Sequence, residues 1–436
     1  MNQAEIVARM KEVAPPGPEP TTAQYDQLRE LTTVLTSNAG KDYGGEHAVF
    51  SSIALRDLPD GPPGEWVKDK HILVTGGTGC VGSLLIQTLL KFAPGSVSSV
   101  SRGYTQCPSQ RHFPAVKYFH ADVRDPQKLE EVFRQVRPEV VFHVAGQRDP
   151  GLAEREARLT ATVNVVGTYN VLQACHEYQA QRFIFAGTGK AVRPYSQEVY
   201  TSSKRVAEWL VADAARHGLA CGGTRFTHVV DNSIVCQRLR TYSQINIHDP
   251  EIMFYVQSAK ECASLLLLAG EQAVPGEFRI HAITDLGMPV SLLDLAISVV
   301  AGRKDNPAIW FSGYDSGYEA TPYRGLYDPA NAGDVSPLIN ALEAHDAKNY
   351  HGADYFTARY SPRPAEAIAM LTSQLRRTTT DSEARKLLDL MALESLHLHL
   401  GAAPRCVLKR MRDLAKPHPV AEGQKTLATA VNGYAG

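Results

Sequence analysis

A glycine-rich segment between an apolar run and a helical pattern constrains the fold of this chain more than any other feature. Residues 71–75 predict a short buried strand, and apolar side chains recur at helical spacing over residues 83–92. A strand, a tight glycine turn and a helix aim backbone N–H groups and the positive end of the helix at one point, which suits a pyrophosphate. The segment therefore predicts dinucleotide binding, and a glycine-rich loop without a ligand is the alternative. The residues expected around the cofactor are Gly76, Thr78, Gly79, Cys80, Val81 and Gly82.

The pattern after this turn alternates between strand-like and helix-like segments as far as residue 226. Such alternation predicts an α/β fold, a doubly wound parallel sheet of the Rossmann type, with ligands at the carboxyl ends of its strands. Further strands are expected at 97–101, 116–120, 140–145, 183–186 and 222–226, and helices at 126–136, 160–178 and 200–217.

Four regions are expected along the 436 residues. Residues 1–65 form an N-terminal extension, with helical patterns at 1–13 and 24–35, that we expect to pack on the body or on a partner subunit. Residues 66–245 form the Rossmann dinucleotide-binding and catalytic domain. After residue 226 the pattern becomes irregular, which predicts a small substrate-binding region at 246–345. Residues 346–436 have apolar helical periodicity and predict a helical C-terminal extension.

Composition excludes several classes of function. The formal net charge is -1, so no overall field attracts nucleic acid or a membrane surface. No apolar run approaches the roughly 18 residues of a membrane span, and the first residues lack a signal-peptide pattern. The seven cysteines are scattered without CxxC pairs, which indicates reduced thiols and a cytoplasmic protein. No metal is expected, because His397 and His399 are interpreted as a pair on a helix surface rather than ligands.

The end of the second expected strand bears on the choice of cofactor. An acidic residue there would accept the adenosine ribose hydroxyls and favour NAD. This chain has Ser101 and Arg102 instead, and a guanidinium can hold a 2′-phosphate by paired, charge-assisted hydrogen bonds. The prediction is NADP, held in part by Ser101 and Arg102. NAD is the alternative, with Arg102 as a solvated surface residue.

A second group of residues predicts hydride chemistry. Tyr200 and Lys204 stand four residues apart and so share one helical face. An ammonium beside a phenol lowers the phenol pKa, so the tyrosinate can take the proton of a substrate alcohol while a hydride passes to a nicotinamide. Thr188, after the preceding expected strand, can orient the substrate hydroxyl. A YxxxK pattern also arises by chance, but its place beyond this strand strengthens the prediction.

These motifs resemble those of the extended short-chain dehydrogenase/reductases, over roughly residues 68–300. Within that family the chain is most similar to the capsular-polysaccharide-type nucleotide-sugar dehydratases and epimerases, including inverting UDP-N-acetylglucosamine 4,6-dehydratases. The resemblance implies one tightly held cofactor that takes a hydride and later returns it, and a homo-oligomer. It implies Asp122 and Val123 near the adenine, Ala145 and Gly146 beside the cofactor, and Asn164 at the active-site edge of the sheet. The segments that carry it are 75–82, 101–102, 120–125, 143–146, 164–168, 188–191 and 285–296, with Tyr200 and Lys204.

The chain departs from the family pattern where water would be eliminated. The dehydratases have Thr-Asp-Lys, whereas this chain has Thr188, Gly189 and Lys190, so the acid is missing and the lysine remains. Lys190 is a candidate base for the carbon beside a transient ketone. A lysine that only contacts substrate hydroxyls is the alternative.

The substrate side also departs from the pattern. Two arginine segments that would neutralise a nucleotide-sugar diphosphate are replaced at 253–256 and 314–319. Arg193, Arg238 and Arg240 are candidates to replace those arginines, and a nucleoside, monophosphate or free glycoside substrate is the alternative. Gln147, Arg193 and Asn232 are the candidate substrate contacts.

The sequence thus predicts an NADP-dependent sugar-modifying enzyme. Its substrate would be a nucleotide sugar or a related nucleoside or glycoside, whose hydroxyl is oxidised transiently before dehydration or epimerisation with internal return of the hydride. One alternative is an NADP-dependent oxidoreductase with net redox turnover on another small molecule. A second is a non-catalytic cofactor-binding regulator, against which the pair Tyr200 and Lys204 argues.

Overall fold

The computed structural model describes residues 1–39, 58, 66–103, 112–231, 233–287, 289–314, 338–350, 354–364, 366–414 and 422–434. The chain divides into two compact units. The first consists of Met1–Leu55, Thr227–Ala259 and Leu286–Arg324, and the second of Arg56–Phe226, Lys260–Asp285 and Gly325–Gly436. Each unit is assembled from segments that are far apart in the sequence. The linear division expected at residues 65, 245 and 345 stays a prediction.

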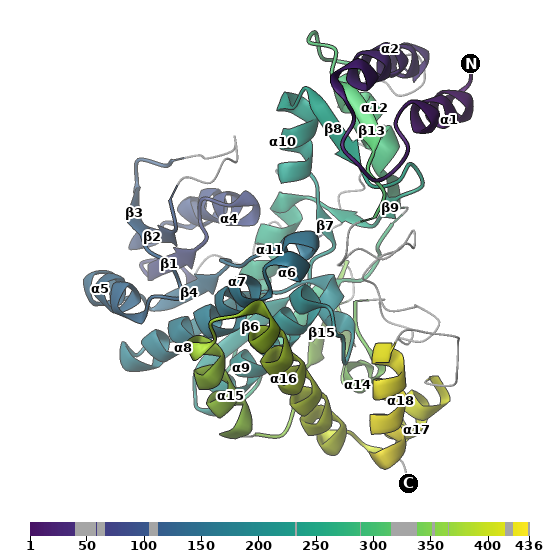
Figure 1. Ribbon diagram of the computed structural model, residues 1–436. Helices are drawn as coiled ribbons and strands as arrows, with labels where there is room; N and C mark the ends of the chain where they lie inside the picture. The colour runs from purple at the N-terminus through teal and green to yellow at the C-terminus, as the bar shows by residue number, and fades with distance from the viewer. Residues whose placement is uncertain are drawn as a thin grey trace. The chain divides into compact units, whose positions relative to one another are not determined.

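The second unit is built on a sheet of nine strands in the described part of the chain (Figure 1). Its order is β14-β15-β11-β6-β5-β4-β1-β2-β3, and the strands from β11 to β3 run parallel. β15 pairs antiparallel with β11 and with β14. The expected doubly wound fold is confirmed. The strands are β1 His71–Thr75, β2 Ser96–Ser101, β3 Val116–His120, β4 Val140–His143, β5 Arg182–Ala186, β6 Ala220–Thr224, β11 Arg279–Ile283, β14 Lys348–Asn349 and β15 Tyr355–Arg359.

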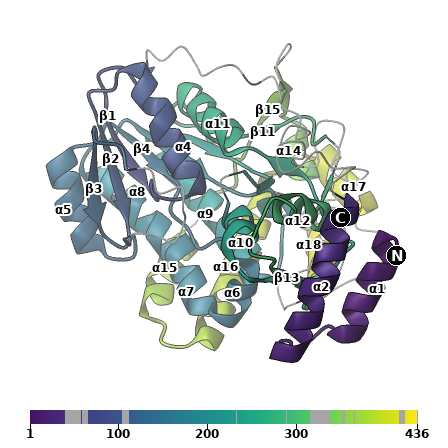
Figure 2. The same cartoon turned by 90° about the horizontal axis from the view of Figure 1, so that it is seen from above.

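Helices cover both faces of this sheet. α4 (Cys80–Leu89) and α11 (Ala259–Glu271) lie on one face, and α8 (Gly167–Glu177) and α9 (Val199–Arg216) on the other (Figures 1 and 2). Asp125 caps the start of α5 (Pro126–Val136), because its carboxylate accepts the N–H groups of residues 127 and 128. Helix α5 packs on α8. Two-sided coverage explains the nearly uniform burial of β1 and β4, as expected for parallel strands.

The C-terminal extension forms a further layer outside α9. α15 (Glu366–Arg377) packs on α16 (Asp381–Ala402), and α16 packs on α7 (Ala157–Ala161) and α9. Leu388, Met391 and Leu396 belong to the same apolar core as the sheet. α14 (Ala341–Ala344), α17 (Arg405–Leu414) and α18 (Glu422–Tyr434) complete this region. The helical C-terminal extension that the periodicity predicts is thereby confirmed.

The helix expected as one piece at 160–178 is interrupted. α7 is followed by a π-helical turn at Thr162–Val166 (η3), and only then does α8 begin. The five residues of this turn are all buried. π-helical turns are rare and often mark functional sites. This one contains Asn164, which the family resemblance associates with the active-site edge.

The first unit has its own core, to which the N-terminal helices contribute. α1 (Gln3–Val13) and α2 (Thr22–Ala39) pack on β13 (Ala308–Phe311), and α2 also packs on α12 (Leu292–Val300). The hydroxyl of Thr32 in α2 accepts the backbone N–H of Ile309 at 3.0 Å. The expectation that the N-terminal helices pack on the body is confirmed. The unit also contains β7 His228–Val229, α10 Ile234–Thr241, β8 Gln244–Ile247, β9 Met253–Phe254, β10 Val256–Gln257 and β12 Val290–Ser291.

Within the described ranges, none of the helices combines the length and the apolar character that crossing a membrane requires.

Candidate active site

The glycine turn joins β1 to α4 in the way that the sequence predicts. Gly76 has a φ of +73°, which favours glycine, and a Cβ there would lie 2.7 Å from the backbone nitrogen of Ala145. A Cβ on Gly82 would lie 2.8 Å from the Cα of Gly77, so the first turn of α4 can approach the strand only without a side chain. Gly79, at the start of α4, makes no side-chain cap. The cradle therefore fits a pyrophosphate at the helix N-terminus.

The neighbouring strand ends are held together by a buried histidine. Nδ1 of His143 lies 2.8 Å from the hydroxyl of Thr75, and Nε2 lies 3.0 Å from the hydroxyl of Thr168. Burial, with a smaller effect of Lys204, lowers the pKa of His143 to about 3, so this imidazole is neutral. It fixes β1 beside β4 at the point where the strand order reverses, where doubly wound sheets bind ligands.

Three of the predicted residues meet beside β4. A Cβ on Gly146 would lie 3.0 Å from Nζ of Lys204 and 3.2 Å from Oδ1 of Asn164. Asn164 accepts the N–H of Gln147 at 2.8 Å and donates to the carbonyl of Gln147 and to the hydroxyl of Ser203, each at 3.0 Å. The π-helical turn thus places Asn164 where it ties the segment after β4 to helix α9. The side chain of Gln147 donates to Thr160 and to the carbonyl of Asp149, so it braces this segment from within.

Tyr200 lies in the first turn of α9 and is partly buried. Burial raises its pKa, while a hydrogen bond with Thr188 and the charge of Arg148 oppose that rise. The sequence argument predicted instead that Lys204 would lower this pKa. The structure corrects this expectation: burial raises the pKa of Tyr200 overall, and the groups that oppose the rise are Thr188 and Arg148. The predicted pair of Thr188 and Tyr200 does meet.

Lys204 lies one turn along α9 and is almost fully buried. Its ammonium donates to the carbonyl of Ala186 at 3.1 Å and lies 5.0 Å from the centre of the Phe185 ring. Burial lowers its pKa to about 8, and the carboxylate of Glu208 opposes that effect. The end of β5 therefore fixes the position of this cation beside Gly146.

Lys190 and Arg193 meet a carboxylate that the sequence analysis did not single out. Nζ of Lys190 lies 3.3 Å from one oxygen of Glu198, and a guanidinium nitrogen of Arg193 lies 2.8 Å from the other. The hydroxyl of Thr201 donates to Glu198 at 2.8 Å. Burial works to raise the pKa of Glu198, but Lys190, Arg193 and Thr201 outweigh it and hold that pKa below its ordinary value. A carboxylate just before a helix with the candidate tyrosine in its first turn is the signal that could have identified this group.

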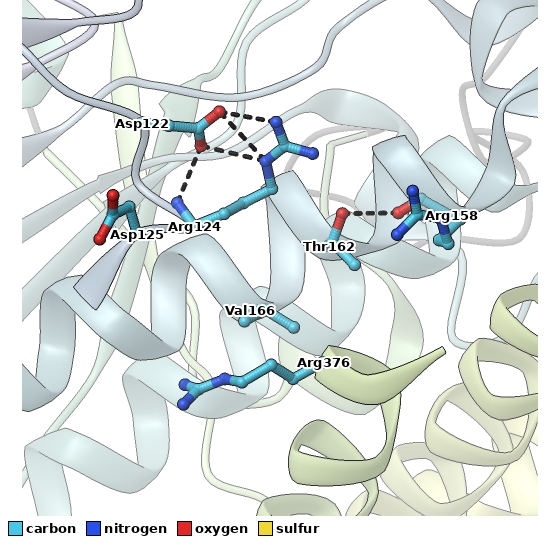
Figure 3. A pocket seen from close by; sticks show the side chains of 7 residues that line it. All are labelled: Asp122, Arg124, Asp125, Arg158, Thr162, Val166 and Arg376. Atoms are coloured by element: carbon cyan, nitrogen blue, oxygen red, sulfur yellow. Dashed lines mark hydrogen bonds and ion pairs between the residues drawn. The ribbon is translucent and has the colours of Figure 1, made fainter. Parts of the chain in front are cut away.

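The end of the sheet expected to hold adenosine is also charged. Arg102, about half exposed, lies 4.0 Å from the carboxylate of Asp122, which pairs with Arg124 at 2.7 Å. Burial works to raise the pKa of Asp122, but Arg124 and Arg102 lower it overall. The backbone of Val123 accepts a hydrogen bond from Asn170 at 3.0 Å. A pocket opens here, and Figure 3 shows its lining of Asp122, Arg124, Asp125, Arg158, Thr162, Val166 and Arg376.

The remaining predicted residues are Arg238, Arg240 and Asn232. Arg238 and Arg240 lie in α10 of the first unit and are exposed. Asn232 lies outside the described residues, as do 315–319 of the segment compared with the lost arginines. His399 corrects one interpretation, because it is buried rather than on a helix surface, and its Nδ1 lies 3.1 Å from Arg205.

A second charged cluster, missed in the sequence, lies along α9. Arg225 pairs with Glu208 at 2.8 Å and with Glu343 at 2.7 Å, and Arg205 pairs with Glu343 at 2.8 Å. These four side chains are between 0% and 3% exposed. They join α9 to the strand end at Arg225 and to α14, and His399 adds a contact from α16.

The order of the sheet, the glycine turn and the group around Thr188, Tyr200 and Lys204 define an extended short-chain dehydrogenase/reductase. The chain belongs to the polysaccharide biosynthesis protein family, whose pattern matches residues 72–318. The family expected from the motifs is thereby confirmed.

Known relatives are similar over part of their length. The capsular polysaccharide biosynthesis protein CapD of Staphylococcus aureus is 27% identical over 65% of this chain and 47% of its own. The inverting UDP-N-acetylglucosamine 4,6-dehydratase of Campylobacter jejuni is 30% identical over 37% of this chain and 49% of its own. The chain thus spans about half of each relative. The crystal structure of Thermus thermophilus UDP-glucose 4-epimerase in complex with NAD has a TM-score of 0.50 and 19% identity, covering 73% of this chain and 98% of its own.

Proposed function

We propose that this chain is an NADP-dependent sugar-modifying enzyme that oxidises one substrate hydroxyl and later returns the hydride to the same substrate molecule. The observation that carries the proposal is the meeting of Thr188 with Tyr200 one turn before the buried ammonium of Lys204. Inversion of the oxidised carbon or dehydration at its neighbours is the net reaction. The substrate is a nucleotide sugar or a related nucleoside or glycoside.

Different residues would handle the proton of the substrate hydroxyl and hold the cofactor. Thr188 orients the substrate hydroxyl, and Tyr200 takes its proton and gives it back. Because burial raises the pKa of Tyr200, groups that lower this pKa are needed for the phenol to lose its proton near neutral pH, and the hydrogen bond with Thr188 and the charge of Arg148 act in that direction. A bound nicotinamide would supply hydride acceptance and return. Lys204 and Asn164 would hold its ribose end, and Gly76, Gly79 and Gly82 its pyrophosphate.

The choice of NADP rests on Arg102. Its guanidinium is about half exposed just beyond the end of β2, with Asp122 4.0 Å away. Asp122 is itself paired with Arg124, so it competes only weakly with a phosphate for Arg102. NAD, bound by the Thermus thermophilus epimerase, is the alternative cofactor. A homo-oligomer in the cytoplasm stays a prediction from the family resemblance and the composition.

Turnover without added cofactor tests the internal redox cycle. The purified chain would be mixed with UDP-N-acetylglucosamine, UDP-glucose or dTDP-glucose as probes, while absorbance reports the reduced nicotinamide. We expect a transient reduction of bound cofactor and a product formed with no cofactor supplied. A strict requirement for one added NADP or NADPH per product would show net redox turnover instead.

The cofactor is tested separately by titration of the cofactor-free chain. Arg102→Ala should weaken NADP binding by about tenfold or more, because a charge-assisted pair is lost, and should leave NAD binding nearly unchanged. Arg137→Ala is the control, because Arg137 comes before the start of β4, whereas Arg102 follows the end of β2, and these strands run parallel. Equal weakening of NADP and NAD by Arg102→Ala would contradict the assignment.

A further inference from the structure

Besides Tyr200 and Lys204, helix α9 turns Glu208 toward the end of strand β5. The ammonium of Lys204 donates to the carbonyl of Ala186 at 3.1 Å. Glu208 follows Lys204 by four residues and therefore lies on the same face of α9. A Cβ on Gly187, the residue after Ala186, would lie 3.3 Å from a carboxylate oxygen of Glu208. Lys204 and Glu208 thus reach neighbouring residues of one strand end.

This strand end leads directly to the proposed substrate contact. The N–H of Gly187 donates to the carbonyl of Thr224 at 2.9 Å. A Cβ on Gly187 would collide with that carbonyl, so only glycine lets the chain pass this close to the end of β6. Gly187 precedes Thr188, which is proposed to orient the substrate hydroxyl. Glu208 therefore lies beside the backbone that carries Thr188.

Arg225 holds the carboxylate of Glu208 in place. Its Nε and Nη2 donate to the two oxygens of Glu208 at 3.0 and 2.8 Å, and both side chains are fully buried. The same guanidinium donates to Glu343 at 2.7 and 2.9 Å. Two buried carboxylates therefore share one cation, but they differ in their relation to Lys204.

Glu208 is the carboxylate of this pair that acts on Lys204. Burial lowers the pKa of Lys204 to about 8, and the charge of Glu208 opposes that effect. On its own helix Lys204 has Tyr200 as a further titratable neighbour. On β4 it faces His143, which is neutral because burial lowers its pKa to about 3. β5 brings the uncharged ring of Phe185, whose centre lies 5.0 Å from the ammonium.

Resting on the function proposed above, we propose that Glu208 is a positioning residue for Lys204. Its carboxylate keeps the side chain of Lys204 as an ammonium at the end of β5, where this cation would hold the nicotinamide ribose. Arg225 fixes Glu208 in this place. Glu343 completes the buried cluster without acting on Lys204.

The charge of Lys204 can be measured without turnover. Acetic anhydride acylates the neutral amine, so the pH dependence of acetylation in the cofactor-free chain, followed by mass spectrometry, gives the midpoint at which Lys204 loses its proton. We expect a midpoint near pH 8 in the unchanged chain. In Glu208→Gln the ammonium loses its negative neighbour, so the midpoint should fall by about one pH unit or more. Glu208→Asp keeps the charge and should restore most of the difference.

The matched control is Glu343→Gln, which removes the other carboxylate of the pair. Both variants leave the same surplus positive charge in the interior, so both should lose stability. Glu343→Gln should nevertheless keep the acetylation midpoint of Lys204 close to that of the unchanged chain. Equal midpoints in Glu208→Gln and the unchanged chain, or equal shifts in the two variants, would overturn the role of Glu208.

If Glu208→Gln does not fold, a double variant takes its place. Glu208→Gln combined with Arg225→Gln removes one charge of each sign, so the remaining cluster stays balanced. Lys204 still loses its carboxylate, and its midpoint should again fall. An unchanged midpoint in the double variant would also overturn the inference.

The same shift should appear in the proposed reaction. UDP-glucose or UDP-N-acetylglucosamine is the probe, and absorbance follows the transient reduction of bound cofactor as a function of pH. Because the ammonium is lost as the pH rises, the alkaline decline of the reduction rate should begin at lower pH in Glu208→Gln than in Glu343→Gln. A decline at the same pH in both would count against the inference. If neither probe reduces the bound cofactor, the proposed function fails, whereas the acetylation midpoint still decides whether Glu208 keeps Lys204 charged.

Discussion

Helix α9 carries two clusters of charged side chains that differ in burial and balance. At its start, Lys190 and Arg193 face Glu198, and these side chains are 11% to 21% exposed. Farther along, Arg205, Arg225, Glu208 and Glu343 are 0% to 3% exposed. The buried cluster has equal numbers of positive and negative groups, whereas the first has a surplus positive charge among these three.

Because of this difference, we expect the two clusters to contribute unequally to the stability of the fold. A balanced, buried network holds elements in place, and removal of one partner leaves an uncompensated charge in the interior. A cluster that water can reach loses less stability when one partner is removed. We infer that the second cluster holds the helix in place and that the first contributes less to stability.

The largest expected effect concerns Tyr200, which lies between the two clusters and belongs to neither. Tyr200→Phe should lower turnover by about 10²- to 10⁴-fold, because the acid and base for the substrate hydroxyl is lost. Cofactor content and unfolding midpoint should stay close to those of the unchanged chain. Turnover within about twofold of the original would show that the hydroxyl proton passes through another group.

Glu343→Gln tests the buried cluster. It leaves Arg205 and Arg225 with Glu208 as their remaining carboxylate, so the free energy of unfolding should fall by about 3–5 kcal/mol. Urea unfolding followed by circular dichroism measures this change. A loss below about 1 kcal/mol would mean that the network contributes little, and the contrast between the two clusters would collapse.

Acid should destabilise the second unit through buried neutral histidines, one of which adjoins the buried cluster. Burial lowers the pKa of His143 and His399 to about 3 and that of His281 to about 4, all from 6.5. Below pH 6.5 the unfolded chain binds protons that the folded chain does not. Stability is therefore full above that pH and falls as the pH drops toward 4, by up to about 1.4 kcal/mol per pH unit for each histidine.

Urea unfolding at pH 7 and pH 5 measures this slope. His399→Gln should reduce it by roughly the share of one histidine, since glutamine does not titrate. An unchanged slope in that variant would show that His399 is already protonated in the fold.

The smallest expected effect is on stability in Glu198→Gln, the counterpart of Glu343→Gln in the first cluster. Because these side chains are partly exposed, the free energy of unfolding should change by on the order of 1 kcal/mol or less. A loss as large as that expected for Glu343→Gln would show that the first cluster is as structural as the second. The same urea titration compares the two variants directly.

The sequence predicted the parts of the fold that depend on local patterns. The glycine turn, the strands at 71–75 and 116–120 and the helix at 126–136 follow from sterics, periodicity and capping, and the structure has them in those places. β11 and β15 are as long as β1 but were not predicted, because both follow the point where the alternation ends and are defined by their pairing with β6, with each other and with β14.

The sequence predicted those residues of the candidate site whose type and spacing point to a single structural role. Close contacts with backbone atoms require glycine at Gly76 and Gly82, and a spacing of four residues places Tyr200 and Lys204 on one face of α9. Glu198 and Arg225 were missed because a single charged residue gives no signal until its partners, which come from other elements, are placed beside it. The π-helical turn was hidden for a similar reason, since its apolar pattern reads as continuous helix.

The two discontinuous units have a practical consequence for anyone who shortens this chain. The stretch that matches the family, residues 72–318, would seem a natural fragment to express. It would remove α1 and α2, whose Ile6 and Leu28 fill the first core, and α16, whose Leu388 and Leu396 fill the second. Such a fragment would expose apolar surface in both units. We therefore expect that a fragment able to fold has to include α1, α2 and α16.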